Sequence, residues 1–261
     1  MALPAADESL WLRRFHPRPN AAVRLVCLPH AGGAASSYAP LSALLPPSIQ
    51  ALAVQYPGRQ DRRHDTPLES VHELARAVFE ALRPSADQGP LALFGHSMGA
   101  SVGFEVARLM EDELGVVPAV LFASGRPAPS LHRSLGIHRM DDAGIIAELQ
   151  AVSGTDDRVL DNAELLRLTL PSLRSDYKAA ETYRYRPGPK LGCDIVGLTG
   201  DGDNRVSIEE VAAWKEHTAG SFTLQVFPGG HFYLQEQKAA VAGVLTDTLR
   251  AATRTGGHPL H

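Results

Sequence analysis

The segment Gly95-His96-Ser97-Met98-Gly99 has the G-x-S-x-G pattern that places a serine nucleophile on a sharp turn between a strand and a helix. An apolar run at residues 91–94 precedes it and a segment with helical periodicity follows it, which is the context that the chemistry needs. The two glycines let the chain turn tightly, so that the Ser97 hydroxyl is exposed at the strand tip. This context favours a nucleophile over an ordinary serine in a glycine-rich turn.

A serine hydroxyl is a weak nucleophile near neutral pH, so it needs a base within hydrogen-bond reach and an acid that orients the base. In α/β folds with such a turn, these groups follow in the order nucleophile, acid, histidine. His231 follows a predicted strand at residues 223–227. The other downstream histidines fit less well, because His217 ends a predicted helix and His258 and His261 lie in the C-terminal tail. We therefore expect His231 to be the base.

The acid is expected in the loop Gly200-Asp201-Gly202-Asp203-Asn204, which follows a predicted strand at residues 194–198. Asp203 is preferred to Asp201, because a residue directly after the strand-ending glycine is still in the turn, whereas one three residues on can reach the nucleophile. Asp201 stays open as the alternative. A calcium loop is disfavoured, because the later glycine and terminal glutamate of such a loop are missing.

Hydrolysis through an acyl-serine also needs two donors for the oxyanion, usually backbone N–H groups. Met98, directly after the nucleophile, is predicted to supply one. The other is expected from the glycine-rich loop His30-Ala31-Gly32-Gly33 after the first long predicted strand, with Ala31 as the donor. His30 and His96 are interpreted as loop-stabilising side chains.

Strand and helix patterns alternate along most of the chain. Strands are predicted at residues 23–28, 49–56, 91–94, 119–123, 194–198 and 223–227. Helices are predicted at residues 68–82, 98–110, 208–217 and 235 to about 252, followed by a frayed tail from Thr253. The alternation predicts an α/β-hydrolase fold: a mostly parallel central sheet flanked by helices, in a single domain over residues 1–261.

The block from about residue 126 to residue 189 interrupts this alternation. It contains no good strand pattern, only helical stretches at residues 143–152 and 162–183. We expect it to be a helical lid, inserted over the carboxyl edge of the sheet, where it would cover the site.

Composition excludes several classes of function. The chain has 261 residues, of which 44% are hydrophobic and 21% charged, with a formal net charge of −4, so no nucleic-acid partner is expected. Cys27 and Cys193 lie in apolar runs and are interpreted as buried reduced thiols, which argues against a zinc site or disulfide. Neither a signal peptide nor a membrane-spanning run is apparent, so a cytoplasmic protein with no membrane contact is expected.

Four dispersed motifs resemble those of the stand-alone type II thioesterases of polyketide and non-ribosomal peptide synthesis. They are Pro29-His30-Ala31-Gly32-Gly33, Tyr56-Pro57-Gly58-Arg59, the pentapeptide around Ser97, and Pro228-Gly229-Gly230-His231-Phe232. The segment Leu170-Pro-Ser-Leu-Arg-Ser-Asp-Tyr177 is similar to a lid helix of that family. The resemblance spans nearly the whole chain and does not depend on the serine pentapeptide alone.

The resemblance implies a catalytic triad of Ser97, Asp203 and His231, and an oxyanion hole at Ala31 and Met98. It implies hydrolysis of aberrant acyl groups from the phosphopantetheine arm of acyl carrier or peptidyl carrier proteins, which would be the partners. The substrate is carried on phosphopantetheine, so no cofactor or metal is expected. A monomer is expected.

The domain organisation bears on which group accepts the acyl unit, water in hydrolysis or a group of the substrate itself in macrocyclisation. The first long strand is predicted to begin within about twenty-five residues of Met1, so we expect no fused carrier domain. A free-standing enzyme must meet its carriers by diffusion, which favours hydrolytic proofreading over programmed macrocyclisation. The alternatives are a medium-chain fatty-acyl thioesterase, a carboxylic-ester hydrolase of the same fold and, from another class, a catalytically idle binding protein.

Overall fold

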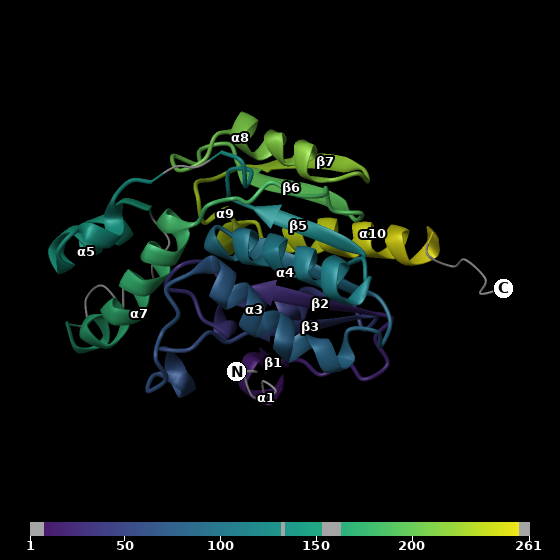
Figure 1. The fold of residues 1–261 in the computed structure, drawn as a ribbon, viewed down its shortest axis with the longest axis horizontal. Coiled ribbons are helices and arrows are strands. Elements are labelled where there is room, and N and C mark those ends of the chain that lie inside the picture. The colour runs from purple at the N-terminus through teal and green to yellow at the C-terminus, as the bar shows by residue number, and fades with distance from the viewer. Residues whose placement is uncertain (1–7, 132–133, 153–162, 256–261) are drawn as a thin grey trace.

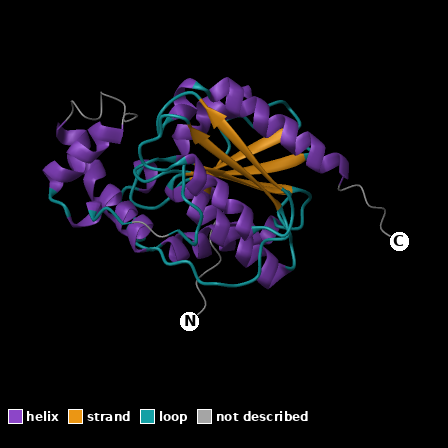
Figure 2. Ribbon diagram, turned by 90° about the horizontal axis from the view of Figure 1, so that it is seen from above, coloured by secondary structure: helices purple, strands orange, loops and turns teal. Residues whose placement is uncertain are grey.

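A seven-stranded sheet with helices on both faces forms the body of the protein in the computed structural model, which describes residues 8–131, 134–152 and 163–255 (Figures 1 and 2). The strand order is β1-β3-β2-β4-β5-β6-β7, with β1 antiparallel to β3 and the other neighbours parallel. The strands are β1 (Leu12–Arg13), β2 (Val23–Leu28), β3 (Ile49–Val54), β4 (Leu91–His96), β5 (Val120–Ser124), β6 (Asp194–Gly200) and β7 (Phe222–Phe227).

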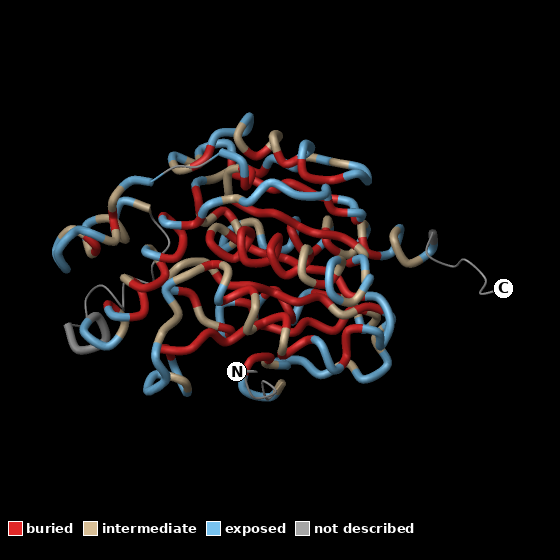
Figure 3. The backbone as a smooth tube through the Cα atoms, viewed as in Figure 1, coloured by how far each residue is buried: buried red, intermediate tan, exposed pale blue. Residues whose placement is uncertain are grey.

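Helices cover both faces of the sheet. Successive side chains of each central strand point to opposite faces, so both sets are buried. In β2, Val26 and Leu28 pack on the face covered by α3 (Val71–Leu82) and α4 (Met98–Leu114), whereas Leu25 and Cys27 pack on the other. The second face is covered by α2 (Ala39–Leu44) and α10 (Lys238–Thr255). Figure 3 shows the central strands and α4 almost wholly buried. The carboxyl edge of this sheet is therefore held rigidly.

The shorter elements complete the chain between these layers. They are α1 (Glu8–Trp11), α8 (Ile208–Ala212), α9 (Tyr233–Glu236) and the 3₁₀ helices η1 (Ala35–Tyr38), η2 (Gln60–Arg62), η3 (Arg83–Ser85) and η5 (Ala213–His217). The six predicted strands and four main helices are present, with shifted ends. Sequence periodicity missed α1, β1, η1 and α2, which are too short to show it.

Two expectations about helices were wrong in detail. The helix predicted at residues 208–217 changes from α8 to the 3₁₀ helix η5 at Ala213. The predicted tail does not begin at Thr253, because α10 continues to Thr255 and the Thr253 hydroxyl donates to the Leu249 carbonyl at 3.0 Å. The rest of that tail, residues 256–261, lies outside the described residues.

The block between β5 and β6 projects from the end of the sheet to which the strand arrows point (Figure 1). It contains η4 (Ile137–Arg139), α5 (Asp142–Val152) and α7 (Ala163–Thr182); residues 132–133 and 153–162 of the predicted lid lie outside the described residues. Ile137, Ile145, Leu170 and Leu173 form a small apolar cluster of their own. Towards its C-terminal end, α7 packs on the main core through Ala179 and Ala180.

Candidate active site

Ser97 lies on a strained turn between β4 and α4. Its backbone has φ +53° and ψ −118°, and Gln60 is the only other non-glycine residue of the described segments with positive φ. A Cβ on Gly95 would lie 2.1 Å from the Gly99 oxygen, and one on Gly99 would lie 2.0 Å from the Leu28 oxygen. The turn therefore requires glycine at both positions, which explains the motif in physical terms.

The structure brings together His231 and Asp203, the predicted base and acid. The Nδ1 atom of His231 lies 2.9 Å from Asp203 Oδ2, and the two side chains are 7% and 0% exposed. The other oxygen of Asp203 accepts the backbone N–H groups of Arg205 at 2.8 Å and Val206 at 3.3 Å, which fixes the carboxylate. Asp201 is exposed and accepts the Gly229 N–H at 3.0 Å instead. The structure thus brings Asp203, and not Asp201, to the histidine.

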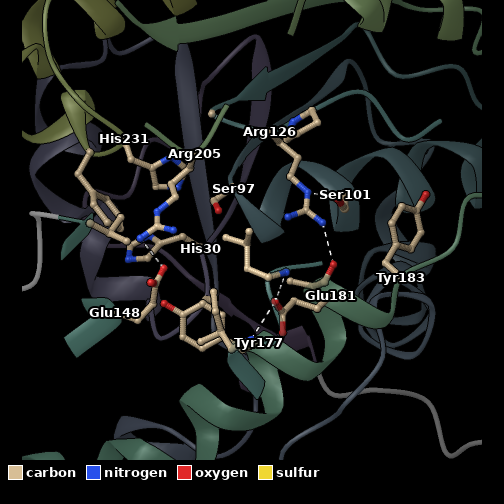
Figure 4. Close-up of a pocket in the computed structure, with 18 of the residues that line it drawn as sticks. His30, Ser97, Ser101, Arg126, Glu148, Tyr177, Glu181, Tyr183, Arg205 and His231 are labelled. Atoms are coloured by element: carbon tan, nitrogen blue, oxygen red, sulfur yellow. Dashed lines mark hydrogen bonds and ion pairs between the residues drawn. The ribbon is translucent and has the colours of Figure 1, made fainter. Parts of the chain in front are cut away.

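Ser97 and His231 line the same pocket, opposite lid residues Glu148, Tyr177 and Glu181 (Figure 4). Because His231 Nδ1 faces Asp203, the Nε2 atom is the one available to take a proton from the nucleophile. Within the described segments no hydrogen bond joins the Ser97 hydroxyl to His231. The catalytic roles of the three residues stay predictions that this shared pocket supports.

The two predicted oxyanion donors are also near Ser97. Ala31 lines the pocket, and Met98 is the first residue of α4, where a helix leaves its N–H groups without intrahelical partners. In the loop, the Gly32 N–H donates to Asp176 Oδ2 at 2.8 Å and the Gly33 N–H to the His30 carbonyl at 2.9 Å. Their engagement leaves the Ala31 N–H as the loop donor that can serve an oxyanion.

His30 and His96 surround the candidate base without contacting Asp203. The His96 ring lies 5.0 Å from the His231 ring, and His96 Nδ1 lies 2.9 Å from the Ser124 hydroxyl, which in turn lies 2.6 Å from the Tyr233 hydroxyl. Burial, reinforced by His231 and His30, holds the pKa of His96 well below its usual range. A neutral His96 would let His231 carry the positive charge that its predicted role as the base requires.

The pKa of His30 is lowered to about 4, first by burial and then by His231 and Arg59. Since the unfolded chain takes up this proton near the ordinary value of 6.5, the folded state loses stability as the pH falls from 6.5 towards 4. When the pH falls from about 7.5 to about 5, the free energy of unfolding should decrease in both proteins. We expect this decrease to be about 2 kcal/mol smaller in His30→Gln than in wild type. Urea unfolding at both pH values measures it.

The control for this prediction is His64→Gln, at an exposed position, which should leave the pH dependence as in wild type. Equal acid sensitivity of His30→Gln and wild type would contradict the prediction.

The lid supplies most of the pocket wall beyond Ser97. The pocket encloses about 1070 Å³ of empty space, including its mouth. The larger aliphatic side chains among its lining residues all come from the lid: Leu131, Leu135, Ile137, Leu149 and Val152. Such a wall suits an acyl chain better than a charged substrate.

Four charged residues of this wall were not predicted from the sequence. Arg205 pairs with Glu148 of α5 at 2.7 Å, and partly buried Arg126 donates to the Ser101 hydroxyl at 3.0 Å and to the Ala180 carbonyl at 2.8 Å. Burial lowers the pKa of Arg126. Burial acts to raise the pKa of Glu181, but hydrogen bonds from His138 and its neighbours outweigh it and lower that pKa. No local sequence pattern marks these residues, because their partners lie far away along the chain.

The described part of the chain also bears on metal ligands, thiols and membrane-spanning helices. Its His, Cys, Asp and Glu side chains form no group of three that could hold a metal ion. Cys27 and Cys193 are buried and unpaired, and burial raises the pKa of the Cys193 thiol to about 12. None of the described helices is long and apolar enough to cross a bilayer.

Comparison with known proteins decides the family. A model of the thioesterase domain matches residues 23–249. The chain belongs to the thioesterase family. It is 55% identical to the thioesterase PikA5 of Streptomyces venezuelae over 243 residues, which covers 93% of this chain and 86% of PikA5. It is 47% identical to a probable cadicidin biosynthesis thioesterase of Streptomyces griseus, covering 90% of this chain and 65% of that protein.

The fold agrees with that assignment. The structure of the type II thioesterase BorB from the borrelidin biosynthetic cluster matches with a TM-score of 0.86 and 51% identity, over 92% of this chain and 98% of BorB. This thioesterase therefore has the predicted α/β-hydrolase fold, and the predicted enzyme class, a thioester hydrolase, is confirmed.

Proposed function

We propose that this thioesterase hydrolyses acyl groups from the phosphopantetheine thioester of acyl carrier or peptidyl carrier proteins, and so edits stalled or aberrant units in polyketide or non-ribosomal peptide synthesis. The observation that carries the proposal is a buried Asp203–His231 pair beside Ser97, in a lid-covered pocket. PikA5 and BorB, to which the chain is similar over most of its length, support the pathway.

The geometry supports a two-step reaction through an acyl-serine. Ser97 Oγ attacks the thioester carbonyl while His231 Nε2 takes its proton, and Asp203 stabilises the imidazolium that forms. The N–H groups of Ala31 and Met98 stabilise the oxyanion. The C–S bond then breaks, and the proton held by His231 Nε2 passes to the departing sulfur, which leaves His231 neutral again. A thiol with a pKa near 8.5 needs this protonation less than an alkoxide would.

Water completes the cycle. His231 Nε2 takes a proton from water as the water attacks the acyl-serine, and returns it to Ser97 Oγ as the carboxylic acid leaves. The overall products are a free phosphopantetheine thiol on the carrier and the released acid. We also expect that the enzyme acts as a monomer in the cytoplasm, without a cofactor.

A substrate panel tests the proposed substrate class. Purified enzyme should cleave short acyl groups from acyl carrier proteins and from acyl-N-acetylcysteamine, with kcat/KM at least about tenfold above that of matched oxygen esters. The reason is that the thiolate leaves without full protonation. Hydrolysis is followed by mass spectrometry of the carrier and by thiol release.

The same panel separates the alternatives. A preference for oxygen esters would indicate a carboxylic-ester hydrolase, and a preference for medium-chain fatty-acyl thioesters would indicate a fatty-acyl thioesterase. Release of cyclised product alone would contradict editing by hydrolysis.

A further inference from the structure

A buried ion pair joins the lid to the loop that carries the Ala31 donor. Arg59, in the loop after β3, donates two hydrogen bonds to Asp176 of α7: Nη1 to Oδ2 at 2.7 Å and Nη2 to Oδ1 at 2.9 Å. The side chains are 6% and 0% exposed. A buried pair of this kind costs desolvation, so it adds little to stability by itself and calls for another explanation.

Both members of the pair also hold the backbone of the Ala31 loop. Asp176 Oδ2 accepts the Gly32 N–H at 2.8 Å, and Arg59 Nη1 donates to the Gly33 carbonyl at 3.0 Å. Leu173, one helical turn before Asp176, lies so close that a Cβ on Gly32 would be 2.8 Å from its Cδ1 atom. The lid helix therefore contacts the loop through an apolar and a charged side chain.

These contacts determine where the Ala31 N–H points. Gly32 has φ +78°, and its N–H follows Ala31 directly, so anchoring that N–H to Asp176 fixes the peptide after Ala31. The turn bond from Gly33 to His30 closes the loop on the other side. An oxyanion donor is effective only when it is already oriented in the free enzyme, because reorientation during the reaction would cancel its benefit.

We propose that Arg59 and Asp176 are positioning residues that orient the Ala31 N–H toward the oxyanion and make this orientation depend on the docked lid helix α7. The proposal rests on the proposed function, since it takes Ala31 as an oxyanion donor. Neither residue touches the reacting atoms. They act through the loop backbone, so their loss should weaken the transition state more than substrate binding.

The central variant is Asp176→Asn, which is nearly the same size but cannot carry the charge that Arg59 requires. On acyl-N-acetylcysteamine we expect kcat to fall about 10- to 100-fold with KM within about twofold. A trifluoromethyl ketone analogue, which forms a tetrahedral oxyanion on Ser97, should lose affinity in the same proportion. A non-hydrolysable thioether analogue, which forms none, should bind as in wild type.

Two further variants separate positioning from folding. Lys178→Ala removes another ion pair between α7 and the body, to Glu69, but touches no loop atom and should leave kcat within about twofold. The double variant Arg59→Met/Asp176→Leu leaves no unpaired buried charge and so keeps the fold, as circular dichroism would show, yet kcat should stay low.

Wild-type kcat in Asp176→Asn or in the double variant would overturn the proposal, as would equal losses of thioether and ketone affinity. Failure of the proposed function looks different: wild-type enzyme would then show no thioester hydrolysis.

Discussion

Ser97→Ala is expected to lower kcat for acyl-N-acetylcysteamine hydrolysis by about 10⁴- to 10⁶-fold and to abolish labelling by a fluorophosphonate. The variant removes the oxygen that forms the acyl-enzyme. It keeps the same Cβ at φ +53°, so it introduces no new backbone strain and should fold as wild type. Single-turnover kinetics and mass spectrometry of the labelled protein measure the two effects.

Ser101→Ala is the matched control for this prediction. Ser101 is a buried hydroxyl of the same pocket, one turn further along α4, and it accepts a hydrogen bond from Arg126. Its loss should lower activity by less than about tenfold and leave fluorophosphonate labelling intact. Labelling of Ser97→Ala, or loss of labelling only in Ser101→Ala, would assign the nucleophile to another residue.

The second large effect is expected from Asp203→Asn, which should lower kcat/KM by about 10⁴-fold. The amide can still contact His231 but cannot stabilise an imidazolium, and it can present an N–H that selects the wrong tautomer of the ring. The Asp203 side chain is fully buried, so solvent does not replace the lost charge. Steady-state kinetics on the same thioester substrate measure this loss.

Asp201→Asn tests the alternative acid with the same chemical change. Its oxygen accepts the Gly229 N–H from an exposed position, a bond that the amide oxygen can also make, so activity should stay within about threefold of wild type. A larger loss in Asp201→Asn than in Asp203→Asn would reverse the assignment.

Local sequence patterns determined the frame of this protein. The glycines at 95 and 99 are required by backbone contacts within the strand-turn-helix unit and the adjacent β2, so the motif is visible in the sequence. The alternation of apolar runs and helical periodicity likewise gave the parallel sheet, because it reflects burial on both faces. Order along the chain then placed Asp203 and His231 after adjacent strands.

What only the tertiary structure decided is how distant segments meet. The motif at Tyr56-Pro57-Gly58-Arg59 and the lid segment ending at Tyr177 were both visible, but no pattern paired Arg59 with Asp176, which are 117 residues apart. The same holds for Arg205 and Glu148, which pair at the pocket wall. A buried charge is stabilised by whichever partner the fold brings within hydrogen-bond distance, and that distance is a property of packing rather than of residue order.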